Sequence, residues 1–156
     1  MNCQATPHDI HAVKCELAGE ALRRSGALRL RVTGWSMLPS VWPGDTLVFG
    51  PIDGDRVAEG DIVLFGRGSR LVAHRVVARS ACDASILTRG DAVAQADAPL
   101  QDGDLLGKVS FIVRNGRCIE PSKAPRFSER AVSALIRRSE VAARVVVGVH
   151  GMRKKS

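Results

Sequence analysis

The chain has 156 residues, 45% of them hydrophobic and 25% charged, which is the composition of a globular domain and excludes general disorder. Its net charge of +7 comes from the C-terminal quarter: residues 1–113 hold 12 Lys and Arg against 13 Asp and Glu, whereas residues 114–156 hold 11 against 3. No apolar run approaches the roughly 18 residues that cross a bilayer, so we expect no transmembrane segment.

The first 26 residues predict a helix. Thr6 can cap it and Pro7 can occupy its first position, apolar residues recur at helical spacing after them, and Gly26 supplies a stop signal. We therefore expect a separate N-terminal element over residues 1–26, with its helix over about 8–25.

The N-terminal segment also indicates where the protein is located in the cell and whether it binds a metal ion. It lacks the basic start and apolar centre of a secretory signal peptide, and the four cysteines form no Cys-x-x-Cys pair, so we expect reduced thiols in a soluble, cytoplasmic protein. Three potential ligands can share one face of the helix: His8, His11 and Cys15. No second ligand pair accompanies them, so we predict no metal site.

From residue 27 the hydrophobic period changes to two, which is typical of strands half buried in a sheet. Glycine-rich turns separate the apolar runs, notably at 66–68 and at Asn115-Gly116, and no helical pattern intervenes. The pattern predicts a mainly β, antiparallel domain over residues 27–120. Its expected strands cover residues 28–32, 46–49, 61–65, 71–77, 85–88 and 105–113.

Residues 121–156 predict a basic amphipathic helix and tail. Packing of its apolar face on the domain's own core is the favoured interpretation, and docking on an anionic membrane surface is the alternative. Simple solvation of the basic face is equally compatible with the charge, and we expect no nucleic-acid partner. The oligomeric state is left open.

A serine follows the first predicted strand in a glycine-bearing turn, Gly34-Trp35-Ser36-Met37-Leu38-Pro39. Serine needs a neighbouring base to become a nucleophile, and between Ser36 and residue 113 the candidates are His74 and Lys108. Imidazole is the side chain best suited to this task at neutral pH. On an apolar strand face, however, a histidine is more often a core residue.

A third group is expected to orient the histidine ring, as in serine hydrolases. The loop after the next predicted strand holds two acids, Asp91 and Asp97, and the residue pattern alone does not choose between them.

Five blocks of the chain occur in the order seen in the type I signal peptidases: Gly34 to Pro39 with Pro43-Gly44-Asp45, Gly60 to Val63, His74-Arg75-Val76, Thr88 to Asp91, and Gly107-Lys108-Val109. Residues 28–113 thus resemble this family of serine proteases, which shares its β fold with the self-cleaving repressor proteases. The His-Arg-Val block is similar to the histidine-type branch of endoplasmic-reticulum, archaeal and sporulation-type enzymes.

The resemblance implies a serine endopeptidase without a cofactor that cleaves a peptide or precursor protein. It implies Ser36 as nucleophile, with its backbone N–H at the oxyanion, and His74 as general base. It favours Asp97 as the orienting acid and Asp91 as a supporting one, and it gives Lys108 little weight. Shallow substrate pockets are expected from residues near the serine: Leu30, Val32, Met37 and Leu64.

Two departures from the family matter for function. Gly34 stands where lysine-type enzymes often have a serine that assists the oxyanion, and a soluble helix stands where signal peptidases have a membrane anchor. We therefore expect a soluble or peripherally attached enzyme that acts on the cytoplasmic side. The alternative is a self-cleaving regulatory domain, or a non-catalytic peptide-binding module, of the same fold.

Overall fold

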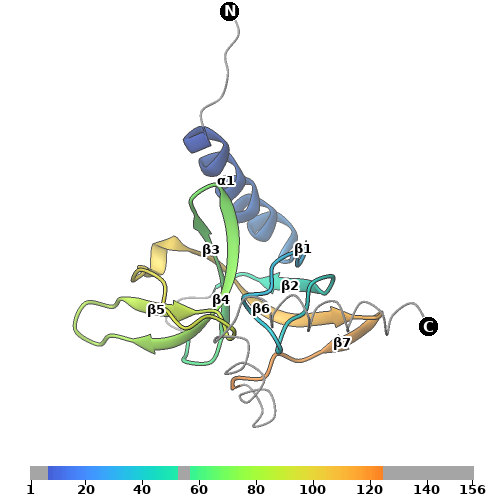
Figure 1. Cartoon of the computed structure of the whole chain (residues 1–156). Coiled ribbons are helices and arrows are strands. Elements are labelled where there is room, and N and C mark those ends of the chain that lie inside the picture. The colour runs from blue at the N-terminus through green and yellow to red at the C-terminus, as the bar shows by residue number, and fades with distance from the viewer. Residues whose placement is uncertain (1–6, 53–56, 125–156) are drawn as a thin grey trace, which may run out of the picture.

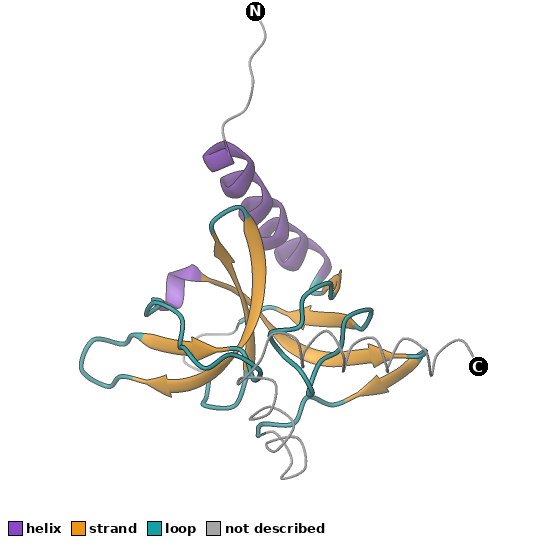
Figure 2. Ribbon diagram, in the orientation of Figure 1, coloured by secondary structure: helices purple, strands orange, loops and turns teal. Residues whose placement is uncertain are grey.

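The computed structural model describes residues 7–52 and 57–124, with side chains from residue 12 onward. It is a mainly β structure in which one helix, α1 (Pro7–Ser25), accompanies an antiparallel seven-stranded sheet (Figures 1 and 2). The strands are β1 (Leu28–Arg31), β2 (Thr46–Gly50), β3 (Ile62–Arg67), β4 (Arg70–Arg79), β5 (Ile86–Arg89), β6 (Leu105–Arg114) and β7 (Arg117–Ile119), with the short 3-10 helix η1 (Asp102–Asp104) before β6.

The strand order is β1-β2-β6-β3-β4-β5, and β7 also pairs with β6. Two long strands tie the sheet together. The first half of β6 pairs with β3, while its second half pairs with β2 and β7. Similarly, β4 pairs with β3 through its first six residues and with β5 through its last five. Strands that are distant in sequence, such as β2, β3 and β6, thereby lie next to one another in one sheet.

The strand β3 is buried on both faces of the sheet, which explains its uninterrupted apolar run. Ile62 and Leu64 belong to one hydrophobic cluster, with Met37 and residues of β2 and β6, whereas Val63 and Phe65 belong to a second one, with Val76. The strand therefore separates two small cores, and the functional candidates lie beside it.

The helix α1 packs on the sheet through its C-terminal half. Leu22 is buried in the same cluster as Met37, whereas Val13 and Leu17 are exposed. The helix thus shares the core of the β domain although the sequence marks it as a separate element. Among the described residues, no helix is long and apolar enough to cross a membrane.

The predicted helix over 8–25 and all six predicted strands are present, with ends shifted by up to two residues. The turn expected at 66–68 lies instead at residues 68–69, because β3 continues through Gly66 to Arg67. Asn115 and Gly116 form the expected hairpin turn with φ values of 51° and 76°, the left-handed conformation that such two-residue turns require. The predicted C-terminal helix lies beyond residue 124, outside the described residues.

Candidate active site

Ser36 lies in a tight turn between β1 and β2. The N–H of Leu38 donates to the carbonyl of Trp35, and the N–H of Val41 donates to that of Met37. Three apolar side chains of this turn are almost fully buried: Met37, Leu38 and Val41. The turn is thus anchored in the core, which fixes Ser36 at the surface of the sheet while its hydroxyl stays partly exposed.

A pocket of about 430 Å³ opens beside Ser36. Its lining includes all four residues that the sequence suggested for substrate binding: Leu30, Val32, Met37 and Leu64. Both Ser36 and His74 line it as well, so a group held in the pocket lies next to the serine and the histidine.

Ser36, His74 and Asp97 form a connected set. The Ser36 Oγ lies 3.0 Å from Nε2 of His74, and Nδ1 of His74 lies 2.6 Å from Oδ2 of Asp97. His74 and Asp97 are only 7% exposed, while the ring of His74 packs edge-on against Phe65. Strand β4 supplies the histidine, and the loop after β5 supplies the aspartate. These are the nucleophile–base–orienter contacts that acyl-transfer chemistry requires.

The Asp97 carboxylate has two further hydrogen-bond donors. The buried Thr88 hydroxyl donates to Oδ2 over 2.8 Å, and a guanidinium N–H of Arg67 donates to Oδ1. The backbone N–H of Asp97 in turn donates to the Thr88 carbonyl over 2.8 Å. With both oxygens engaged, the carboxylate is held in one orientation, which fixes the ring of His74.

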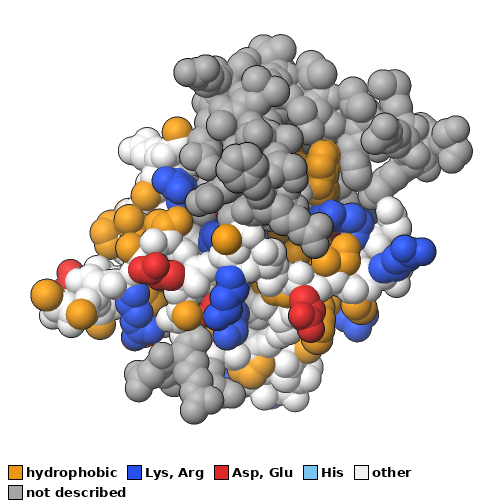
Figure 3. All heavy atoms as spheres, turned by 90° about the horizontal axis from the view of Figure 1, so that it is seen from below, with side chains coloured by type: hydrophobic (Ala, Val, Ile, Leu, Met, Phe, Trp, Pro, Cys, Tyr) orange, Lys and Arg blue, Asp and Glu red, His pale blue; other side chains and the backbone are white. Residues whose placement is uncertain are grey.

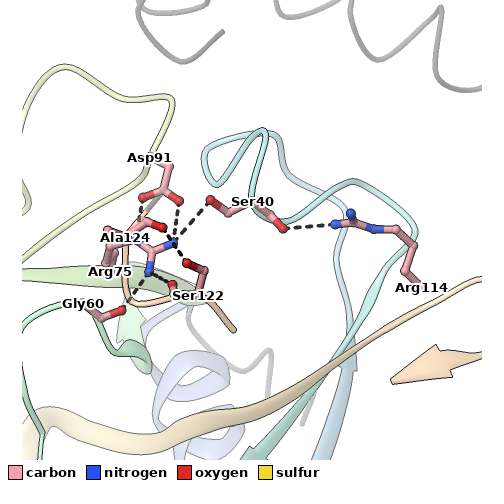
Figure 4. Close-up of polar contacts among 7 residues, drawn as sticks. All are labelled: Ser40, Gly60, Arg75, Asp91, Arg114, Ser122 and Ala124. Carbon is pink, nitrogen blue, oxygen red and sulfur yellow. Dashed lines mark hydrogen bonds and ion pairs between the residues drawn. The ribbon is translucent and has the colours of Figure 1, made fainter. Parts of the chain in front are cut away.

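Asp91 does a different task from Asp97. It binds the guanidinium of Arg75 through both oxygens, at 2.9 Å from Nε and 2.8 Å from Nη2. Both side chains are buried: that of Arg75 is 6% exposed and that of Asp91 is 4% exposed. Arg75 also donates to the carbonyls of Gly60 and Ser122 and to the Ser40 hydroxyl (Figure 4). A buried charge needs such complete pairing, and Arg75 thereby joins four other segments of the chain to β4.

The loop that carries Asp91 also contacts the serine. The N–H of Ala92 donates to the carbonyl of Ser36 over 2.8 Å. A Cβ placed on Gly90 would lie 2.6 Å from the same carbonyl oxygen, so only glycine permits this approach. On the other side of the turn, Arg114 donates to the Ser40 carbonyl over 3.0 Å (Figure 4). The turn that carries Ser36 is thereby held at both ends.

The resemblance, not the residue pattern, favoured Asp97 over Asp91 as the acid that orients His74. In the structure His74 contacts Asp97, while Asp91 contacts Arg75. Lys108 lies on β6 with its Nζ 3.5 Å from Asp61, and it is not among the residues lining the pocket. The contacts of Thr88, Gly90 and Arg67 were not anticipated. Thr88 and Gly90 stand in a block that carried the resemblance, which was the available signal, whereas nothing in the sequence marked Arg67.

Within the described residues, no group of three His, Cys, Asp or Glu side chains is arranged to hold a metal ion. The chain matches no protein-family model and none of the curated proteins.

Proposed function

We propose that the chain is a serine endopeptidase of the signal-peptidase type, acting on a peptide or precursor protein from the cytoplasmic side. The observation that carries the proposal is the contact series from Ser36 through His74 to Asp97. The order of the sequence blocks and the antiparallel sheet support the family assignment.

The hydrogen bonds assign the proton positions that the reaction needs. A carboxylate can only accept, so Nδ1 of His74 carries the proton that points to Asp97. In the neutral ring, Nε2 is then the acceptor, and it faces the Ser36 hydroxyl. This is the tautomer in which an imidazole can take a proton from serine.

The reaction follows from these positions. Ser36 Oγ attacks the peptide carbonyl while its proton moves to Nε2 of His74, and the resulting imidazolium is stabilised by the Asp97 carboxylate. His74 then gives this proton to the leaving amine, and the C–N bond breaks to leave an acyl-enzyme. A water molecule, deprotonated by His74, releases the acid product and restores the serine.

The backbone N–H of Ser36 is proposed as the oxyanion donor. Within the described part of the chain, it makes no hydrogen bond to another residue. Gly34 brings no side-chain donor to the turn, so backbone groups would carry this stabilisation.

Two open strand edges suggest how an extended peptide would bind. β1 pairs only with β2, and residues 70–74 of β4 pair only with β3, among the strands that the structure describes. Both segments line the pocket beside Ser36. A substrate strand can use their free backbone groups and place its side chains in the pocket.

Labelling with a fluorophosphonate probe, followed by intact-mass measurement, tests the proposal. We expect one adduct on the wild-type chain and on Ser110→Ala, which removes an exposed serine of β6, and none on Ser36→Ala or His74→Ala. An adduct on Ser36→Ala contradicts the assignment of the nucleophile. An unlabelled wild type that still binds extended peptides favours the non-catalytic module instead.

A further inference from the structure

Three arginines line the pocket: Arg31 at the end of β1, Arg67 at the end of β3 and Arg70 at the start of β4. All three residues are exposed, so they belong to the solvent-facing part of the lining, which is called here the mouth of the pocket. Among the residues that the structure describes, no Asp or Glu lines the pocket. The mouth is therefore one-sidedly basic.

The three charges are not equivalent. Arg67 pairs with Asp97, and its charge is matched by that buried carboxylate. Arg31 and Arg70 make no ion pair with any residue in the described part of the chain. Two positive charges at the mouth thus have no counter-charge from these residues.

Below the mouth the pocket is apolar. The lining from β2, β3 and β4 includes the buried Leu47, Phe49 and Leu64 and the half-buried Leu71 and Ala73. A site of this kind accepts an apolar side chain and places the neighbouring residues of an extended peptide near the two arginines.

One face of the molecule, seen from below in Figure 3, has mixed surface charge. On the part of this face that is not covered by grey atoms, basic and acidic side chains are interspersed (Figure 3). Residues 1–113 as a whole also hold slightly more acidic than basic side chains. The basic mouth is therefore a local feature of the pocket and does not follow from the net charge of residues 1–113.

We infer that the pocket selects an acidic peptide: an extended segment with an apolar side chain in the pocket and Asp or Glu residues on either side, next to Arg31 and Arg70. The inference deepens the proposed function, since it takes the pocket beside Ser36 as the place where the substrate lies.

Binding can be measured without cleavage by using the full chain with Ser36→Ala. The probes are three fluorescein-labelled, end-blocked peptides: Glu-Glu-Val-Ala-Ala-Val-Glu-Glu, the same peptide with Gln for Glu, and the same with Lys for Glu. Fluorescence polarisation gives their affinities at about 0.05 M and about 0.3 M NaCl, which changes the screening of exposed charges.

We expect the Glu peptide to bind about three- to tenfold more tightly than the Gln peptide at low salt, with the Lys peptide weakest. The advantage should shrink at high salt and disappear when Arg31→Gln and Arg70→Gln are added. Arg29→Gln with Arg117→Gln is the matched control: it removes the same charge from exposed positions that do not line the pocket, and should leave the advantage in place.

Equal binding of the Glu and Gln peptides at low salt, or an advantage that survives loss of Arg31 and Arg70, overturns the inference. Its failure is separable from that of the proposed function, because the binding measurement does not require an active serine. If the wild-type chain is labelled but shows no preference for the acidic peptide, the proposed protease function stands and only the inferred specificity is wrong.

Discussion

Asp91 and Asp97 lie in one loop, yet they form hydrogen bonds with two consecutive residues of β4, Arg75 and His74. Asp97 accepts from the ring of His74, and Asp91 accepts from the guanidinium of Arg75. Neighbouring residues of a strand point to opposite faces, so the loop contacts both sides of β4 at once. One carboxylate serves the proposed reaction, and the other fixes the loop that positions the first.

Asp97→Asn should lower the rate of fluorophosphonate labelling by about 10²- to 10⁴-fold, because an amide no longer selects the His74 tautomer that accepts the serine proton. Asp91→Asn should lower it much less. Labelling rates from a time course of intact masses give the comparison, and Glu16→Gln on the exposed side of α1 is the control. If Asp91→Asn is labelled more slowly than Asp97→Asn, the roles assigned to the two aspartates are reversed.

Asp91→Ala should instead cost stability. It leaves the buried guanidinium of Arg75 without its carboxylate, a loss of about 3–5 kcal/mol in the free energy of unfolding. Urea denaturation followed by circular dichroism measures the change. Asp102→Ala breaks the more exposed pair with Arg79 and should cost about 1 kcal/mol or less. Equal losses in the two variants would show that the buried pair contributes no more than a surface one.

Gly90→Ala should reduce both labelling and stability, because the added methyl would lie 2.6 Å from the Ser36 carbonyl oxygen and would displace the turn that carries Ser36. Gly103→Ala is the matched control, since a Cβ there meets nothing within 4 Å. Wild-type labelling by Gly90→Ala would mean that the turn tolerates the displacement.

Thr88→Val should slow labelling by about five- to tenfold, since it removes the hydroxyl that donates to Asp97 while keeping the side-chain shape. Thr88→Ser restores the donor and should recover most of the rate. Equal rates for the valine and serine variants would exclude a positioning role for this hydrogen bond.

Lys108→Ala should label like the wild type. The lysine contacts Asp61 rather than Ser36, and an ion pair this exposed contributes about 0–1 kcal/mol to stability. A folded but unlabelled Lys108→Ala chain, together with a labelled His74→Ala chain, would assign the base to the lysine.

Local patterns predicted most of the fold because strands half buried in one sheet alternate visibly, as in β1 and β2. β7 escaped individual prediction because its three residues are all exposed and carry no such alternation. In the site, Ser36 and His74 stood out by residue type. The Arg67 and Thr88 contacts depend on how β3, β4 and β5 pair, which no local pattern encodes.

Arg75 donates to the carbonyl of Ser122, and at the other end of the chain Leu22 of α1 is buried against Gly107. A fragment that keeps these two contacts therefore extends at least from within α1 to Ser122. Cutting at residue 26 would uncover the core beneath the helix, and cutting at residue 120 would remove an acceptor from a buried guanidinium. The contacts that support the site thus cross residues 26 and 120, the positions where the hydrophobic period of the sequence changes.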